Sequence, residues 1–194
     1  MGSTKQGDNG PSGDAASAAL GKADSVLDRA AVQAVLLRAA TVDRESDCLT
    51  SIYFAHRARD EISRRQRYGG RLSLLLIVPD RAMEALEPTA AELRRIGAIA
   101  KQKLRTTDLI GRWDDNEVAI LLTQTGLAGT TRLAKRIAAA VAAEPTPEGQ
   151  LPLTVSVGVA TWLGMVETLG TLLERARGGV AEAQSRGGNS VAVT

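Results

Sequence analysis

The chain has 194 residues, of which 44% are apolar and 24% charged, a composition typical of a globular protein with one main domain and an appendage. Its formal net charge of +2 and its low aromatic content argue against a nucleic-acid-binding protein. Arginines do gather in the stretch 57–71, but such a stretch is typical of a solvated helix face. A single cysteine, Cys48, excludes an intrachain disulfide, and no cluster of His and Cys indicates zinc.

The N-terminal part divides into two predicted segments. Residues 1–22 are rich in Gly, Ser, Asp and Ala, so we expect a disordered tail. Residues 23–46 are predicted to contain a helix, because the stretch 24–45 has no Gly or Pro. Mostly apolar residues recur along it at alternating three- and four-residue steps, a spacing that permits a short helical seam between two subunits of a homodimer. The alternative is a helix that lies against its own domain. These positions are Leu27, Ala30, Ala34, Leu37 and Thr41.

The rest of the chain alternates between helical and extended patterns. Two strands flank the turn-forming triplet 114–116 and predict a β-hairpin. This order indicates an α/β (α+β) fold in three layers, a central mixed sheet flanked by helices. The predicted helices cover 52–68, 88–104, 129–143 and 168–185, and the predicted strands cover 72–78, 108–113, 117–123, 153–160 and the last residues of the chain. No segment approaches about 18 uninterrupted apolar residues, so we expect a soluble, cytoplasmic protein without a membrane span.

Five local strings occur in an order and spacing that resemble one family. They are Asp47-Cys48-Leu49-Thr50, the strand 72–80, the hairpin 111–122, the strand 155–160 and the ending 187–191. Together they resemble the GGDEF family of diguanylate cyclases over residues 47–194. The resemblance implies a bacterial signalling domain with a nucleotidyl-cyclase-like fold.

The residues that the family uses for catalysis differ here. Making cyclic di-GMP joins two GTP molecules by phosphoryl transfer, in which carboxylate-bound metal ions neutralise charge. One metal carboxylate of the family falls on Val78, with Asp80 matching only the second acid of that strand end, and the other falls on Asn116, a neutral amide. Asp114 and Asp115 replace the two signature glycines, and they add bulk and negative charge where phosphate would lie.

Further positions of the family's GTP site are also changed. The guanine-reading Asn of the family falls on Leu86, and its two C-terminal basic positions fall on Gln184 and Gly188. Glu117 is retained, but we interpret it as a solvent-facing hairpin residue. We therefore predict a degenerate domain that is not an enzyme, with no catalytic residue, no metal site and no Mg²⁺ or other cofactor.

A second motif of the family is retained. Arg105-Thr106-Thr107-Asp108 resembles the Arg-x-x-Asp inhibitory site that binds the product, and counting from the hairpin places a further arginine of that site on Arg136. An arginine fork can donate to O6 and N7 of guanine, and a carboxylate can accept from its N1 and N2 hydrogens. The alternative is an ordinary ion pair for Arg105 and Asp108, and a solvated helix residue for Arg136.

The leading hypothesis is a cyclic di-GMP receptor that holds the dinucleotide with Arg105, Asp108 and Arg136. The rival is a nucleotide-free module that uses the degenerate domain and the N-terminal helix to dimerise or to dock a downstream protein partner. A third hypothesis is a crippled cyclase or a GTP-binding regulator. Binding of cyclic di-GMP and turnover of GTP distinguish the three.

Overall fold

The structure is a computed structural model that describes residues 29, 31–80, 90–146, 152–164 and 166–194. The chain divides into two compact units, Met1–Ala39 and Ala40–Thr194. The expected tail, the seam positions Leu27 and Ala30, and Leu86 lie outside the described residues. In the first unit the described residues are helical, and this helix continues to residue 41. No helix in the described part of the chain is both long and apolar enough to cross a membrane.

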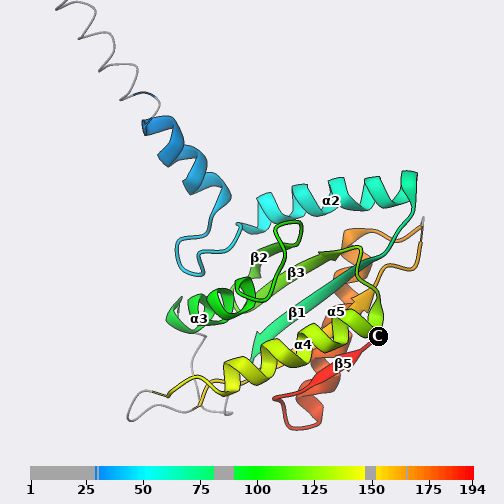
Figure 1. The fold of residues 1–194 in the computed structure, drawn as a ribbon. Coiled ribbons are helices and arrows are strands. Elements are labelled where there is room, and N and C mark those ends of the chain that lie inside the picture. The colour runs from blue at the N-terminus through cyan, green and yellow to red at the C-terminus, as the bar shows by residue number, and fades with distance from the viewer. Residues whose placement is uncertain (1–28, 30, 81–89, 147–151, 165) are drawn as a thin grey trace, which may run out of the picture. The chain divides into compact units, whose positions relative to one another are not determined.

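The second unit is built on a five-stranded sheet in the order β2-β3-β1-β4-β5 (Figure 1). β1 pairs antiparallel with both β3 and β4, β2 pairs antiparallel with β3, and β4 pairs parallel with β5. The predicted mixed sheet is therefore confirmed. The strands are β1 (Leu72–Pro79), β2 (Leu109–Asp114), β3 (Glu117–Thr123), β4 (Val155–Thr161) and β5 (Val191–Val193).

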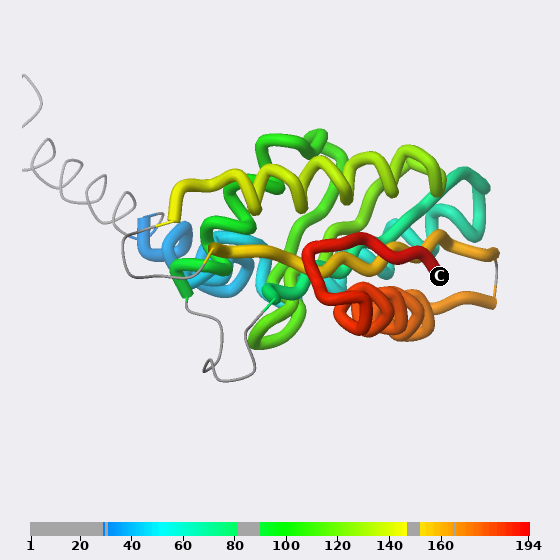
Figure 2. The backbone as a smooth tube through the Cα atoms, turned by 90° about the horizontal axis from the view of Figure 1, so that it is seen from below, coloured from blue at the N-terminus to red at the C-terminus, as the bar shows by residue number. Residues whose placement is uncertain are grey.

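In the described part of the second unit, four helices cover the two faces of this sheet, and Figure 2 shows α4 and α5 on opposite sides of the strands. Side chains of β1 alternate between the faces: Leu75 and Ile77 pack with residues of α3 and α4, and Leu74 and Leu76 pack with residues of α2 and α5. All eight residues of β1 are buried, as expected for an apolar strand covered on both faces. The helices are α2 (Ser51–Tyr68), α3 (Ala90–Lys101), α4 (Leu127–Ala142) and α5 (Leu169–Ser185).

The segment before α2 belongs to the second unit and adds to the sheet edge. The Leu49 amide donates to the Ile110 carbonyl at 3.0 Å, and the Leu49 carbonyl accepts from the Arg112 amide at 2.9 Å. Thr50 caps α2 through its side chain, which accepts from the Tyr53 amide at 3.3 Å. The second compact unit begins at Ala40, and the Thr50 amide donates to the Thr41 carbonyl at 2.9 Å, which ties these first residues to the start of α2.

Candidate functional site

Two groups of candidate residues lie at opposite ends of β2. Asp108 immediately precedes the strand, and the turn of the signature hairpin follows Asp114 at its other end. Six residues of extended chain separate the two ends by about 20 Å. The position expected to bind cyclic di-GMP and the position expected to have lost catalysis are therefore separate places in the fold.

At the hairpin end, strand pairing brings distant residues to one edge of the sheet. Ile77 pairs with Val118 and Val78 pairs with Ser156, so the end of β1 lies beside the starts of β3 and β4. Val78, Asp80 and Glu117 thus share this edge, as the family resemblance implies. We call it the hairpin edge.

The carboxylate of Asp80 is held by three protein hydrogen bonds. It accepts from the hydroxyls of Thr154 at 2.9 Å and Ser156 at 2.5 Å, and from the Asn189 amide at 2.7 Å. Gly188, whose φ is +75°, lies against it, and a Cβ at that position would be 2.8 Å from the Asp80 Cγ. Asp80 therefore joins the ends of β1 and β4 to the turn before β5.

Glu117 does not face solvent, contrary to the expectation from the sequence. It is buried, with 9% of its surface exposed, and its two oxygens accept from Nε and Nη2 of Arg177 at 2.9 and 2.8 Å. The same guanidinium lies 3.2 Å from Glu174 and 3.7 Å from Asp114. The hydrogen bond to Glu117 is the main cause that raises the pKa of Arg177 above its usual value. Glu117 is buried because α5 supplies a cation that pairs with it.

A second arginine organises the hairpin turn. Arg112 donates from Nη2 to the Asp115 carbonyl at 3.1 Å and pairs through Nη1 with Glu45 and, at 3.5 Å, with Asp43. Burial opposes the charged form of Arg112, but the hydrogen bond to Glu45 and the neighbouring carboxylates outweigh it and raise its pKa. The turn is therefore fastened to the segment before α2.

These residues do not suit the divalent cation that the fold family implies. The Val78 side chain has no oxygen that could bind a metal ion, the Asn116 side chain is neutral, and the Asp80 and Glu117 carboxylates already accept hydrogen bonds from other protein groups. Among the described residues, no three His, Cys, Asp or Glu side chains are grouped as a metal ion would require. A hard cation needs several free carboxylate or carbonyl oxygens, and this edge offers them to hydroxyls, amides and a guanidinium instead.

At the other end of β2, Arg105 and Asp108 form one turn. The Asp108 amide donates to the Arg105 carbonyl at 3.1 Å, and the Arg105 amide donates back to Oδ2 of Asp108 at 3.0 Å. The Thr123 amide donates to Oδ1 at 3.2 Å. A carboxylate offers about four lone-pair directions, so Asp108 can still accept from a ligand. The Arg105 side chain is exposed.

Arg136 lies on a separate element, α4, and is exposed. Within the described residues, no hydrogen bond or ion pair joins it to Arg105 or Asp108. The structure therefore brings two of the three predicted ligand residues into one turn and leaves the third on a neighbouring helix.

Sequence reasoning missed Arg177, Arg112 and the hydroxyl partners of Asp80. Ser156 offered a signal, because a hydroxyl inside the apolar strand 153–160 requires a hydrogen-bond partner when it is buried. Arg177 offered none, since a helical arginine is ordinarily solvated. The tertiary position of α5 alone reveals its role.

Comparison with known proteins matches the chain to a protein family. The family described as "Diguanylate cyclase, GGDEF domain" has a model that matches residues 90–190, just over half of the chain. The response regulator PleD of Caulobacter vibrioides is 33% identical over 103 residues, which is 51% of this chain and 23% of PleD. The chain thus spans about a quarter of the length of the curated relative that it matches.

Solved structures share the fold. The coiled coil and GGDEF domain of DgcB from Caulobacter crescentus, determined in complex with c-di-GMP, has a TM-score of 0.78 and 15% identity over 92% of this chain and 98% of that chain. The diguanylate cyclase SiaD of Pseudomonas aeruginosa, determined in complex with its activator SiaC, has a TM-score of 0.72 and 24% identity over 90% of this chain and 72% of that chain. At these identities the likeness concerns the fold.

Proposed function

The chain belongs to the GGDEF domain family of diguanylate cyclases, and from this membership we propose that it binds cyclic di-GMP as a receptor and does not synthesise it. The observation that carries the proposal is a contrast between the two ends of β2. At the hairpin edge the retained acids are used by the protein itself, whereas the Arg105–Asp108 turn presents an exposed guanidinium and a carboxylate with free lone pairs.

The hairpin edge supports the absence of cyclase activity. Phosphoryl transfer requires metal ions beside the reacting phosphates, and a metal ion requires carboxylates that are free to bind it. To bind a metal ion, Glu117 would have to break its two hydrogen bonds with Arg177. Asp80 would have to break three hydrogen bonds that join the ends of neighbouring strands. We therefore expect no cyclic di-GMP from GTP with Mg²⁺ or Mn²⁺, and measurable product would refute this part of the proposal.

The Arg105–Asp108 turn suits a guanine base. The guanidinium of Arg105 can donate two parallel hydrogen bonds to O6 and N7, and the carboxylate of Asp108 can accept from N1 and N2 of a second guanine or of the same one. Arg136 adds a positive charge on α4 for a phosphate or a second base. DgcB, whose domain shares this fold, was determined in complex with c-di-GMP. No metal ion or other cofactor is required for this mode of binding.

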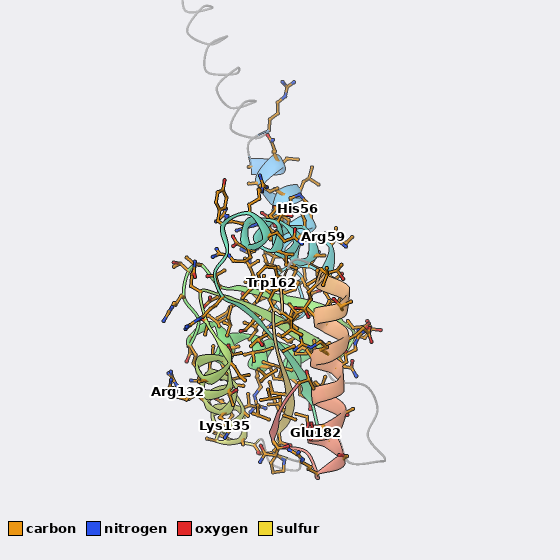
Figure 3. All side chains as sticks on the ribbon, turned by 90° about the vertical axis from the view of Figure 1, so that its right-hand side faces the viewer. His56, Arg59, Arg132, Lys135, Trp162 and Glu182 are labelled. Atoms are coloured by element: carbon orange, nitrogen blue, oxygen red, sulfur yellow. The ribbon has the colours of Figure 1, made fainter. Side chains whose placement is uncertain are left out.

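Calorimetric titration of cyclic di-GMP into the full chain tests the proposal. We expect micromolar or tighter binding for the wild type and at least a tenfold weaker Kd for both Arg105→Ala and Arg136→Ala. Lys135→Ala is the matched control, because Lys135 is the neighbouring exposed cation on α4 (Figure 3). An absence of binding by the wild type would refute the receptor, and equal losses in all three variants would refute the assignment of the site.

A homodimer is the second part of the proposal, and an exposed apolar helix favours it. In the helix of residues 31–41, Val32, Val35, Leu36 and Leu37 are 59–64% exposed. Exposed apolar side chains grouped on one short helix indicate an interface, and the DgcB structure of the same fold includes a coiled coil. We propose a second copy of this chain as the occupant. We also propose that the chain binds a protein partner, because SiaD, which shares this fold, was determined in complex with its activator SiaC. The proposed location of the protein is the cytoplasm.

A further inference from the structure

Arg71 lies at the same end of the sheet as the Arg105–Asp108 turn. The Thr123 amide, at the end of β3, donates to Asp108, and the next amide along the chain, that of Gln124, donates to the Arg71 carbonyl at 2.9 Å. Arg71 immediately precedes β1, and its neighbour Leu72 pairs with Thr123. The ends of three adjacent strands thus bring Arg71 and Asp108 to either side of one dipeptide, Thr123–Gln124.

The side chain of Arg71 is directed toward α4. A Cβ built at Gly126 would lie 3.2 Å from its Cδ and 3.7 Å from its Nη1, so the arginine lies over the N-cap residue of this helix. Arg71 is exposed, and among the described residues its guanidinium has no carboxylate partner. No side chain caps α4 at Gly126, and no acidic residue occupies its first turn. The guanidinium and the helix dipole therefore add two positive contributions at one point.

The backbone around Arg71 is held by its neighbours. Gln124 adopts a φ of +53°, a strained conformation for a residue with a side chain. Beside it, Arg65 is buried and not solvated as the sequence suggested: it lies 3.4 Å from Glu61, and its Nη1 would be 2.7 Å from a Cβ at Gly70. These contacts keep the turn that carries Gln124 close to the residue before β1. They hold the backbone from which the Arg71 side chain extends.

We propose that Arg71 is a fourth ligand-binding residue, which contacts a phosphodiester of the dinucleotide while Arg105 and Asp108 hold guanine. This proposal rests on the proposed function, because it concerns the same site. The two phosphodiesters of cyclic di-GMP and the Asp108 carboxylate together carry three negative charges, whereas Arg105 and Arg136 supply two positive charges, so the site has room for one more cation. Arg71 can supply it, since among the described residues its guanidinium has no carboxylate partner and it lies two strands from Asp108 at the same end of the sheet. An arginine can bind a phosphate oxygen pair through two parallel hydrogen bonds.

Titration calorimetry at two salt concentrations tests Arg71. Arg71→Met keeps the aliphatic stem over Gly126 and removes the charge, whereas Arg71→Lys keeps a charge. We expect Arg71→Met to weaken the Kd of cyclic di-GMP about tenfold at low salt, and to show a smaller salt dependence than the wild type, because one of the screened ionic contacts is gone. Arg71→Lys should keep most of the affinity. Arg57→Ala, which removes an exposed arginine from the first half of α2, should match the wild type.

The outcomes separate this proposal from the one on which it rests. If the wild type does not bind cyclic di-GMP, the receptor itself is refuted. If the wild type binds and Arg71→Met binds equally well, with the same salt dependence, only the role of Arg71 is refuted. An equal loss of affinity in the Met and Lys variants would overturn the phosphate contact. Urea unfolding midpoints within error of the wild type show that the variants remain folded, and a shared shift in midpoint and affinity would indicate a structural role instead.

Discussion

The Asp108 carboxylate accepts a hydrogen bond from the backbone amide of Thr123, with Oδ1 and N 3.2 Å apart. Its other oxygen accepts from the Arg105 amide at 3.0 Å, so one side chain joins the start of β2 to the end of β3. Asp108 therefore has a structural role whether or not a ligand is present. Loss of ligand binding in an Asp108 variant has two possible causes, whereas the Arg105 guanidinium is exposed and offers the cleaner test.

Asp108→Ala should lower the free energy of unfolding in the absence of any nucleotide. Two backbone amides lose a charged acceptor, and each such hydrogen bond is worth about 1.5 kcal/mol or more, reduced where water replaces it, so we expect a loss of about 1–3 kcal/mol. Urea unfolding measures this. Arg105→Ala should change the unfolding free energy by less than about 0.5 kcal/mol, since exposed side chains contribute little. Equal values for the two variants would contradict the structural role of Asp108.

Arg177→Ala should destabilise the domain because it leaves Glu117 buried without a counter-charge. Breaking a fully buried pair costs about 3–5 kcal/mol, and the partial exposure of Arg177 reduces our expectation to about 2 kcal/mol. Arg186→Ala is the control, because it breaks an exposed pair with Glu182 near the end of the same helix and should have almost no effect. Glu117→Gln combined with Arg177→Ala should recover part of the loss. Chemical denaturation of the four proteins decides the matter.

Gly158→Ala should disrupt the contact between β4 and α5. A Cβ at Gly158 would lie 1.8 Å from the Ala176 carbonyl oxygen, so strand and helix would have to separate. We expect a loss of about 3 kcal/mol or more, seen as a large fall in Tm. Gly170→Ala is the matched control: its Cβ would meet only the Thr168 hydroxyl, at 3.7 Å, and alanine favours a helix by about 0.5–1 kcal/mol. Similar Tm values for both variants would contradict the close packing.

Stability should fall in acid partly through Asp43. Burial raises the pKa of Asp43, but the hydrogen bonds from the Ser46 amide and hydroxyl and the charge of Arg112 outweigh it, so its pKa lies below the usual 3.8. A depressed carboxyl pKa stabilises the folded state fully above the unfolded pKa and loses that contribution as pH falls through the folded value. The unfolding free energy of the wild type should therefore decrease more steeply below about pH 4 than that of Asp43→Asn. Parallel pH profiles would contradict this.

Leu37→Lys should weaken the proposed homodimer. Leu37 belongs to the predicted seam and is 64% exposed, so a charge there would be buried unpaired in the interface. Light scattering after size exclusion should give twice the chain mass for the wild type and a lower mass for the variant at the same concentration. Ala39→Lys is the control, because Ala39 is exposed and lies two residues along the same helix, on its opposite face. A monomeric wild type at all concentrations would refute the dimer.

The order of elements could be predicted from the sequence because each follows from local patterns. The largely apolar run 72–78 predicted a strand, and the observed β1 is that strand, buried along its whole length. The hairpin followed from the triplet 114–116 between two β-patterned runs. Element ends differ by a few residues; α3, for example, ends at Lys101 and not at 104, since the following residues turn toward Arg105.

The candidate site was only partly accessible to sequence reasoning. The resemblance to the Arg-x-x-Asp motif singled out Arg105 and Asp108, and the structure shows that the two residues form one turn. The pairing of Glu117 with Arg177, 60 residues away, and the approach of Arg71 to the same end of the sheet depend on how strands and helices pack. Glu117 was expected to face solvent for that reason.

The sequence by itself determined the family, the alternation of helices and strands, and the absence of a carboxylate side chain at Val78 and Asn116, since each depends on residue identity and local order. Only the tertiary structure decided how the remaining charges are used. A carboxylate is equally able to bind a metal ion, an amide or a guanidinium, and which of these it meets is set by residues distant in the sequence. The carboxylates of Asp80 and Glu117 accept hydrogen bonds from hydroxyls, an amide and an arginine of the same chain, whereas the side chains of Arg105 and Arg71 are exposed.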